Sequence, residues 1–221
     1  MRYEEFTIEG RNAVIEAYRA GRPIDKLFIL DGCQDGPILT IKREAKAKQT
    51  PVKFVTKERL DQLSETGKHQ GVIAYAAAYE YATVEEILDN ARQKGEAPFL
   101  FLLDNIEDPH NLGAIIRTAN LAGAHGVIVP KNRAAGLTAV VAKTSAGALN
   151  FTPVARVTNL AKTIEELKKE GIWFVCADMG GTTMYDLNLK GPIGLVIGNE
   201  GEGVGPVSYT HLRAHETGRN L

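Results

Sequence analysis

The sequence predicts an α/β protein in which a mostly parallel sheet follows a smaller α/β unit. Two apolar runs, Phe99–Leu103 and Ile193–Ile197, each open into a polar or glycine-rich loop. Strands buried on both faces of a parallel sheet have such continuous apolar runs. From Pro98 onward, strand and helix patterns alternate, as they do in parallel sheets. Because open α/β sheets bind ligands beyond the carboxyl ends of their strands, both loops are candidate site segments.

Residues 1–77 are predicted to form the smaller unit, with strands packed against helices. Apolar residues recur at helical spacing over residues 12–19, 37–48 and 57–63, and short β-rich runs cover residues 26–30, 52–55 and 72–76.

Residues 78–97 are predicted to join the two units through one helix. Thr83-Val-Glu-Glu86 has the form of a capping box, so the helix should begin after Thr83 and end at Lys94, before Gly95. In the larger domain, residues 98–205, we expect strands over 99–103, 127–129, 172–177 and 193–197, an extended piece near 151–154, and helices over 111–122, 138–146 and 160–170.

Composition indicates a folded chain without a membrane span. Of 221 residues, 44% are hydrophobic, and no apolar run approaches the roughly 20 residues that cross a bilayer. The first residues lack the apolar core of a signal peptide, so we expect a cytoplasmic location. Cys33 and Cys176 follow no metal-ligand spacing and are predicted to be reduced thiols, and no metal site is expected.

A formal net charge of −1 argues against a protein that binds nucleic acid through its overall charge. A local basic patch is compatible with it, formed by the cationic side chains of the N-terminal third. The alternative is a scatter of solvated surface charge. The candidate residues are Arg11, Arg22, Lys26, Lys68 and His69.

The segment from Asn111 to Arg117 is predicted to open a helix. A helix N-terminus presents free backbone N–H groups that suit an anion, and Asn111 is an acceptable N-cap. Arg117 lies among apolar residues of this helix, so we expect its guanidinium to have an anionic or carbonyl partner. That partner can be internal or belong to a ligand, and the sequence leaves both readings open.

The segment Gly198-Asn-Glu-Gly-Glu-Gly203 is predicted to be a tight turn that lets a ligand approach the backbone. No Gly-Lys-Ser/Thr follows, so it is not a P-loop, and no helix pattern follows, so it is not a dinucleotide fingerprint. The carboxylates of Glu200 and Glu202 are better suited to accept hydrogen bonds from hydroxyl or amine groups of a ligand than to hold a phosphate. His69-Gln-Gly71 fits either an RNA contact or plain turn chemistry, and Trp173 is predicted to lie in the core.

Taken together, these motifs resemble the SpoU (TrmH-like) family of RNA ribose 2′-O-methyltransferases, and most closely the subgroup that methylates a guanosine of 23S rRNA. The resemblance covers residues 1 to about 205. It is carried by Glu9-Gly-Arg-Asn12, His69-Gln-Gly71, Asp108-Pro-His-Asn-Leu-Gly-Ala-Ile-Ile-Arg-Thr-Ala119, Val154-Ala-Arg-Val-Thr-Asn-Leu160 and Gly198-Asn-Glu-Gly-Glu-Gly-Val204.

The resemblance implies an N-terminal RNA-binding domain similar to ribosomal protein L30 and a SPOUT-type catalytic domain with a trefoil knot, which acts as a homodimer. It implies S-adenosylmethionine as cofactor and 23S rRNA as substrate. The site residues that it implies are Asn111, Arg117 and Glu200 for catalysis, Ala177, Asp178, Ile197, Gly198, Asn199 and Gly201 for the cofactor, and Arg11, Asn12 and His69 for RNA.

The chain departs from the family after Val204-Gly-Pro206. The family carries a third, Ser/Asn-rich motif and a knot-forming helix, and residues 206–221 match neither. We therefore predict that residues 206–221 are a non-native tail, with a divergent C-terminus as the alternative. A non-native tail would remove part of the cofactor pocket, the knot and the dimer interface. Two rival functions stay open: a tRNA methyltransferase of the same class, and an RNA-binding fragment without catalysis.

Overall fold

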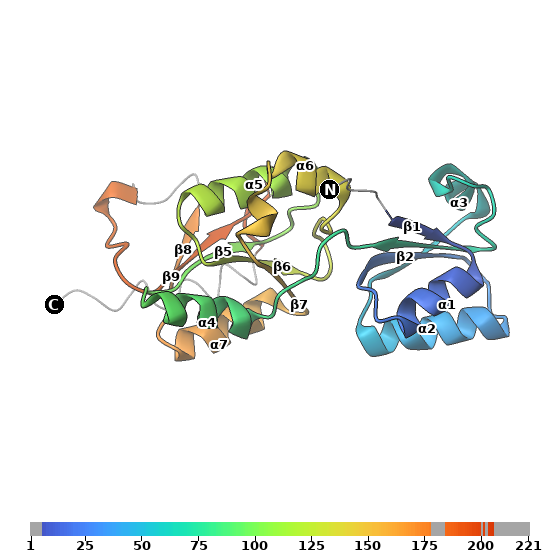
Figure 1. The fold of residues 1–221 in the computed structure, drawn as a ribbon, viewed down its shortest axis with the longest axis horizontal. Helices are drawn as coiled ribbons and strands as arrows, with labels where there is room; N and C mark the ends of the chain where they lie inside the picture. Colours follow the sequence, from blue (N-terminus) through green and yellow to red (C-terminus); the bar gives the residue numbers. More distant parts are fainter. Residues whose placement is uncertain (1–5, 178–183, 200, 202, 206–221) are drawn as a thin grey trace. The chain divides into compact units, whose positions relative to one another are not determined.

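The computed structural model describes residues 6–177, 184–199, 201 and 203–205. The chain divides into two compact units, one of residues 1–80 with 136–140 and one of residues 81–135 with 141–221. The sequence-based boundaries did not anticipate that residues 136–140 group with the first unit. Figure 1 shows the elements of each unit.

The first unit is a four-stranded sheet with helices against it. Its strands are β1 (Phe6–Glu9), β2 (Ile24–Leu30), β3 (Val52–Val55) and β4 (Val72–Ala76), in the order β1-β4-β2-β3. Only β2 and β3 pair in parallel. The helices are α1 (Arg11–Arg19), α2 (Gly36–Lys48) and α3 (Lys57–Leu63). Buried side chains of α1, α2 and the sheet form one apolar core, which includes Val14, Ile29 and Ile38.

The second unit is built on a five-stranded sheet, β7-β6-β5-β9-β8, in which every recorded pairing is parallel. This confirms the predicted mostly parallel sheet. The strands are β5 (Phe99–Leu103), β6 (Gly126–Pro130), β7 (Val154–Val157), β8 (Trp173–Ala177) and β9 (Ile193–Ile197). The helical elements are α4 (Val84–Lys94), α5 (Pro109–Leu121), α6 (Ala139–Thr144), α7 (Leu160–Lys169) and the 3₁₀ turns η1 (Ala148–Asn150) and η2 (Met184–Asp186).

Helices cover both faces of the five-stranded sheet. Ile87 and Leu88 of α4 and Ile164 of α7 pack with strand residues in one apolar cluster. Figure 1 shows α4 and α7 on that face and α5 on the opposite face. The predicted capping box is confirmed, since Thr83 caps α4 reciprocally with Glu86 and Gly95 ends the helix at φ 66°.

Two predictions from the sequence are wrong. Asp108, not Asn111, caps α5, because Pro109 occupies the first helical position and needs no N–H partner there. Trp173 is 55% exposed and is therefore not a core residue. It lies on β8, which is an edge strand of the sheet as far as the described residues go.

Candidate active site at the carboxyl edge of the sheet

Three adjacent strands of the second unit end side by side. Ile197, the last residue of β9, is the register partner of Leu103 in β5 and of Ala177 in β8. The two candidate loops, after Leu103 and after Ile197, therefore start next to each other, as the apolar runs predicted. Ala177 is exposed at the same edge, and the predicted cofactor residue Asp178 lies outside the described residues.

The chain after β9 folds back on itself in a tight turn. Asn199 and Gly203 form an antiparallel bridge, and the Gly203 N–H donates to the Asn199 carbonyl at 3.0 Å. The Asn199 side-chain oxygen accepts a second bond, from the Gly201 N–H at 3.0 Å. A Cβ at position 198 would collide with the backbone of Gly203 and Val204, so only glycine fits there. Glu200, which the resemblance placed near the reaction centre, lies outside the described residues.

A carboxylate of the other loop holds the end of this turn. Asp104, directly after β5, accepts a hydrogen bond on Oδ2 from the Gly205 N–H at 2.9 Å. The Asp104 N–H donates to the Ile197 carbonyl at 2.8 Å. Asp104 thus connects the loop after β5 to the loop after β9 through two hydrogen bonds. Sequence reasoning gave it no role, although a carboxylate directly after a buried strand was the signal available.

Asn111 lies in the first turn of α5 and is half-buried. The cap of that turn is Asp108, whose side chain accepts from the His110 N–H at 3.0 Å. The helix approaches α6 very closely, because a Cβ at Gly113 would overlap Thr144 and the backbone of Ser145. The motif glycine at this position is therefore explained by helix packing, without any ligand.

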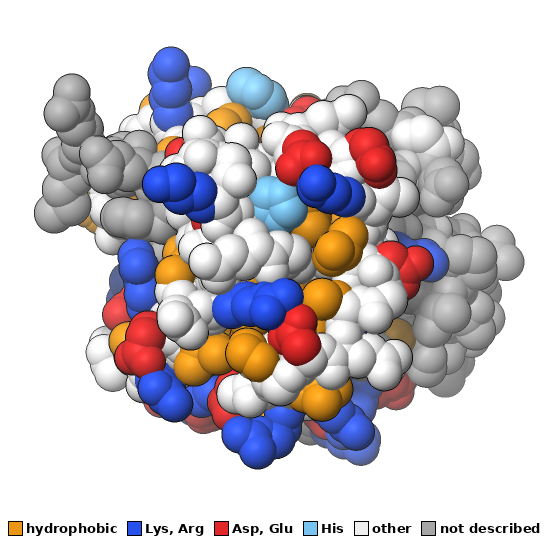
Figure 2. Space-filling model, turned by 90° about the vertical axis from the view of Figure 1, so that its right-hand side faces the viewer, with side chains coloured by type: hydrophobic (Ala, Val, Ile, Leu, Met, Phe, Trp, Pro, Cys, Tyr) orange, Lys and Arg blue, Asp and Glu red, His pale blue; other side chains and the backbone are white. Residues whose placement is uncertain are grey.

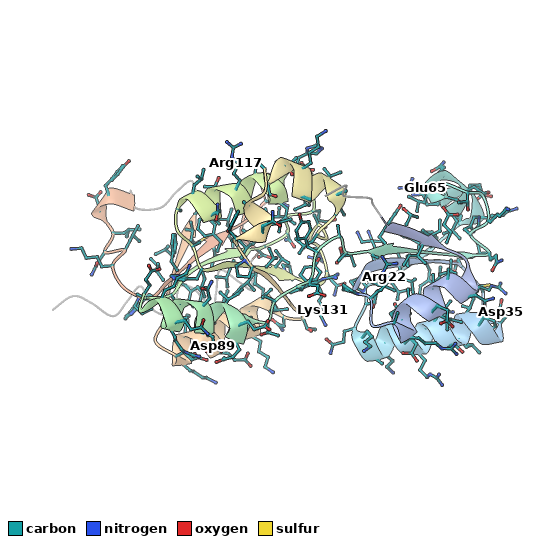
Figure 3. The ribbon with its side chains drawn as sticks, viewed as in Figure 1. Arg22, Asp35, Glu65, Asp89, Arg117 and Lys131 are labelled. Atoms are coloured by element: carbon teal, nitrogen blue, oxygen red, sulfur yellow. The ribbon has the colours of Figure 1, made fainter. Side chains whose placement is uncertain are left out.

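Arg117 is exposed on the outer stripe of α5, which also carries Ala114, Thr118 and Leu121 (Figure 3). Within the described ranges, no hydrogen bond or ion pair is recorded for its guanidinium. The internal partner that the sequence allowed is thus not found among those residues. An exposed guanidinium on this stripe is free to meet an external anion.

In the first unit, the structure brings two distant motifs together. The Gly10 N–H donates to the Val72 carbonyl at 3.2 Å, and Arg11 Nε donates to the Gln70 carbonyl at 3.0 Å. An Arg11 terminal nitrogen also pairs with Asp35 at 2.7 Å. Arg11 therefore has structural partners in addition to the predicted RNA role, whereas Asn12 next to it is exposed.

His69 is buried, at 6% exposure, inside its own loop. Its Nδ1 accepts from the Gly71 N–H at 3.0 Å, so Nε2 carries the proton and faces Asp61 Oδ1 at 2.9 Å. Both ring nitrogens are thereby used within the first unit, which supports the turn-chemistry reading of the motif.

Glu9 organises the neighbouring loop. Its carboxylate accepts from the hydroxyls of Ser64 and Thr66, each at 2.6 Å, and from the Glu65 N–H. Burial alone would raise the pKa of Glu9, but these hydrogen bonds and one from the Thr66 N–H outweigh burial and lower it to about 2.

The proposed basic patch is not uniform. Figure 2 looks onto the first unit, and basic, acidic and apolar side chains interleave on the surface that it shows. His69 is buried and Arg11 is ion-paired, which favours the scatter of charge over a patch of one sign.

A cavity of about 310 Å³ lies elsewhere in the second unit, between α4, α7 and the end of β7. Its lining carries three glutamates and apolar side chains, a poor match for an anionic ligand. The lining residues are Val84, Glu85, Leu88, Val157, Thr163, Glu166, Leu167 and Glu170. Across the part of the chain that the structure describes, no group of three metal-ligating side chains occurs, and no helix is long and apolar enough to cross a membrane.

Known proteins share both units. Residues 98–215 match the family model described as the SpoU rRNA methylase family, and residues 7–82 match the one described as RNA 2′-O ribose methyltransferase substrate binding. The match to the SpoU rRNA methylase family ends at residue 215, ten residues beyond the predicted end of the catalytic domain at residue 205. That residues 206–221 are a non-native tail stays a prediction.

Two curated relatives are similar over most of their length. YacO of Bacillus subtilis (strain 168), described as a TrmH family tRNA/rRNA methyltransferase, is 47% identical over 198 residues, which are 89% of this chain and 79% of YacO. A protein of the same description from Staphylococcus epidermidis is 45% identical over 202 residues, which are 91% of this chain and 81% of the relative.

Solved structures share the fold at lower identity. The SpoU methyltransferase AviRb from Streptomyces viridochromogenes, solved with AdoMet, superposes with a TM-score of 0.53 at 23% identity, over 93% of this chain and 77% of AviRb. An rRNA methyltransferase from Sinorhizobium meliloti gives 0.51 at 23% identity, over 94% and 76%. With both family models matched in order and relatives near half identity, the chain belongs to the SpoU (TrmH) family of RNA methyltransferases.

Proposed function

We propose that this methyltransferase transfers a methyl group from S-adenosylmethionine to the 2′-oxygen of a ribose, in a guanosine of 23S rRNA. The observation that carries the proposal is the joining of the two candidate loops by Asp104 and Gly205 at the carboxyl edge of a parallel sheet. The substrate-binding family match of residues 7–82 supports an RNA substrate.

The chain from Gly198 to Gly205 is called the glycine turn below, and its described residues fit this cofactor. Positions 198, 201, 203 and 205 lack a Cβ, so a flat ligand can reach backbone N–H and carbonyl groups there. We assign cofactor contacts to Ala177, Ile197, Gly198, Asn199 and Gly201, and, outside the described residues, to Asp178. When bound, S-adenosylmethionine supplies an electrophilic methyl group.

The chain's own contribution is to hold the acceptor ribose in line and to stabilise its alkoxide. A guanidinium rarely gives up its proton in a protein. We therefore assign Arg117 to fixing an RNA phosphate and stabilising the developing charge. We assign Asn111, in the first turn of the same helix, to the same site, and proton removal to another group, for which Glu200 is the candidate.

We also propose that the second unit associates with a second copy of the chain through the C-terminal end of α5 and the segment after η1, a surface that leaves Arg117 accessible to RNA. Leu121 is 77% exposed and Phe151 is 76% exposed. The Thr152 hydroxyl donates to Asn120 Oδ1 at 3.1 Å, which holds the segment after η1 against the end of α5. Paired apolar side chains of this size suit a self-complementary interface. Sedimentation should show a dimer that Leu121→Glu dissociates.

The experiment that tests the function offers labelled S-adenosylmethionine to the full chain with 23S rRNA and, separately, tRNA transcripts. Label should enter 23S rRNA at one linkage that then resists alkali, because the methyl group blocks the 2′-hydroxyl. Label in tRNA alone would assign the chain to tRNA. The absence of label in both would favour the RNA-binding fragment. A ribosomal substrate would place the enzyme in the cytoplasm.

Variants of Arg117 separate the roles of its side chain. Arg117→Lys keeps a charge but loses the two-pronged donor geometry, so we expect methyl transfer to fall at least tenfold, about 1.4 kcal/mol. Near-full activity of Arg117→Lys at raised pH would show that two-pronged phosphate binding is not the main role. Arg19→Lys, at an exposed arginine of the first unit, is the matched control.

A further inference from the structure

The motif Val154–Leu160 contains an arginine that the proposed function does not use. Arg156 lies in β7, beside Val129 of β6, and one of its terminal nitrogens donates to the Lys131 carbonyl at 3.2 Å. The Lys131 N–H donates in turn to the Val157 carbonyl at 2.7 Å. Lys131, which directly follows β6 (labelled in Figure 3), is therefore fixed next to Arg156.

The two side chains form a half-buried cationic pair. The Arg156 guanidinium stacks over the Tyr81 ring, 5.3 Å from its centroid. Lys131, Arg156 and Tyr81 are all partly exposed, so a ligand can reach them. Burial, and then the positive charge of Arg156, lower the pKa of Lys131. An anion bound between the two cations would offset both the cost of burying the Lys131 ammonium group and its repulsion by Arg156.

The position of Lys131 and Arg156 along the edge of the sheet indicates which anion they would bind. In the sheet order, β6 and β7 are one and two strands away from β5, on the side opposite β9. Neighbouring strands lie about 4.8 Å apart, so the pair is roughly 5–10 Å from the Asp104 loop along the same edge. The pair therefore lies on the opposite side of the loop after β5 from the glycine turn, within reach of the phosphates that flank a ribose held at Asp104.

We propose that Lys131 and Arg156 form a subsite for a backbone phosphate of the RNA substrate, next to the nucleotide that is methylated. This inference rests on the proposed function, because the distance argument uses a ribose at the Asp104 loop. Both residues position the substrate and do not take part in the chemistry.

Lys131→Gln tests the subsite with little disturbance, because Arg156 binds the backbone carbonyl of Lys131 and not its side chain. The readout is the salt dependence of binding of a fluorescein-labelled single-stranded RNA transcript, without cofactor. Each phosphate contact contributes about 0.7 to the slope of log K against log salt. We expect Lys131→Gln to lower the slope by about that amount, Lys131→Arg to restore it, and Lys94→Gln on α4 to leave it unchanged.

A second arm uses the unaltered protein, in case the glutamine disturbs the end of β6. An amine-acylating reagent should modify Lys131 several-fold less when RNA is bound, and Lys94 equally in both states, as read by mass spectrometry. An unchanged slope in Lys131→Gln, or equal acylation of Lys131 with and without RNA, overturns the subsite. A loss of S-adenosylmethionine binding in Lys131→Gln with unchanged RNA binding would also overturn it. If Lys131→Gln binds RNA with an unchanged salt slope, the subsite is contradicted and the proposed function is not. If the unaltered chain does not bind RNA, the proposed function is contradicted as well.

Discussion

Asp104 and Gly205, which are 101 positions apart in the chain, are joined by a hydrogen bond of 2.9 Å from the Gly205 N–H to Asp104 Oδ2. The bond connects the loop after β5 to the far end of the glycine turn after β9. Under the proposed function, it holds the cofactor segment beside the loop that leads to α5. Asp104 is then a positioning residue whose loss should weaken cofactor binding before it affects the fold.

We expect Asp104→Ala to weaken S-adenosylmethionine binding about tenfold to a hundredfold. A hydrogen bond to a charged acceptor contributes about 1.5–3 kcal/mol, and here that energy stabilises the turn. Isothermal titration calorimetry measures the change. Asp89→Ala, at an exposed carboxylate of α4, is the control and should bind as the unaltered chain does. Equal affinity in both variants would contradict the role of Asp104.

Two glycines of the turn should respond differently to a methyl group. Gly198→Ala should lower the melting temperature of the second unit and abolish cofactor binding, because the new Cβ would overlap the backbone of Gly203 and Val204. Gly201→Ala should leave the melting temperature unchanged, since its Cβ would lie 3.8 Å from Asn199 Oδ1. A weaker cofactor affinity in Gly201→Ala would then report direct ligand contact. If both variants melt alike, the turn does not have the described geometry.

Gly113→Ala should destabilise the second unit by about 1–3 kcal/mol, the usual cost of forcing extra volume between packed elements. The added methyl group would overlap Thr144 and the Ser145 backbone. Urea denaturation followed by circular dichroism gives the free energy of unfolding. Combining the change with Thr144→Ala should recover part of the loss, and no recovery would show that α6 is not the obstacle.

The first unit should lose stability in acid through Glu9. Its folded-state pKa is about 2 against an ordinary value of 4.5, so the carboxylate stabilises the fold above pH 4.5. This contribution is lost as the pH falls from 4.5 towards 2. Hydrogen exchange of α1 and β4 amides, followed across that range, should show a steeper loss of protection in the unaltered chain than in Glu9→Gln. Glu16→Gln, at an exposed carboxylate, should behave as the unaltered chain, and identical profiles for all three would contradict the assignment.

Local patterns were sufficient to predict the α-helices and most strands, although β1 was missed and the extended piece near residues 151–154 was placed three residues before β7. The run Phe99–Leu103 is a buried strand because helices cover both faces of its sheet, and the capping box at Thr83 forms because its partners are three residues apart. The cap of α5 was misplaced by three residues, because the pairing of Asp108 with Pro109 was overlooked.

What the sequence could not provide depends on contacts between distant residues. The exposure of Trp173 follows from the edge position of β8, which no local pattern reveals. The bond between Asp104 and Gly205 and the pairing of Lys131 with Arg156 depend on strand order in the same way. Asp178 and Glu200 remain predictions from the family resemblance.

The most direct test of the central claim is hydrogen–deuterium exchange of the full chain with and without saturating S-adenosylmethionine. If the carboxyl edge of the sheet is the cofactor site, exchange should slow in residues 198–205 and at Asp104 and Asn105, and should stay unchanged around the cavity between α4 and α7. Protection confined to that cavity, with residues 198–205 unaffected, would contradict the assignment.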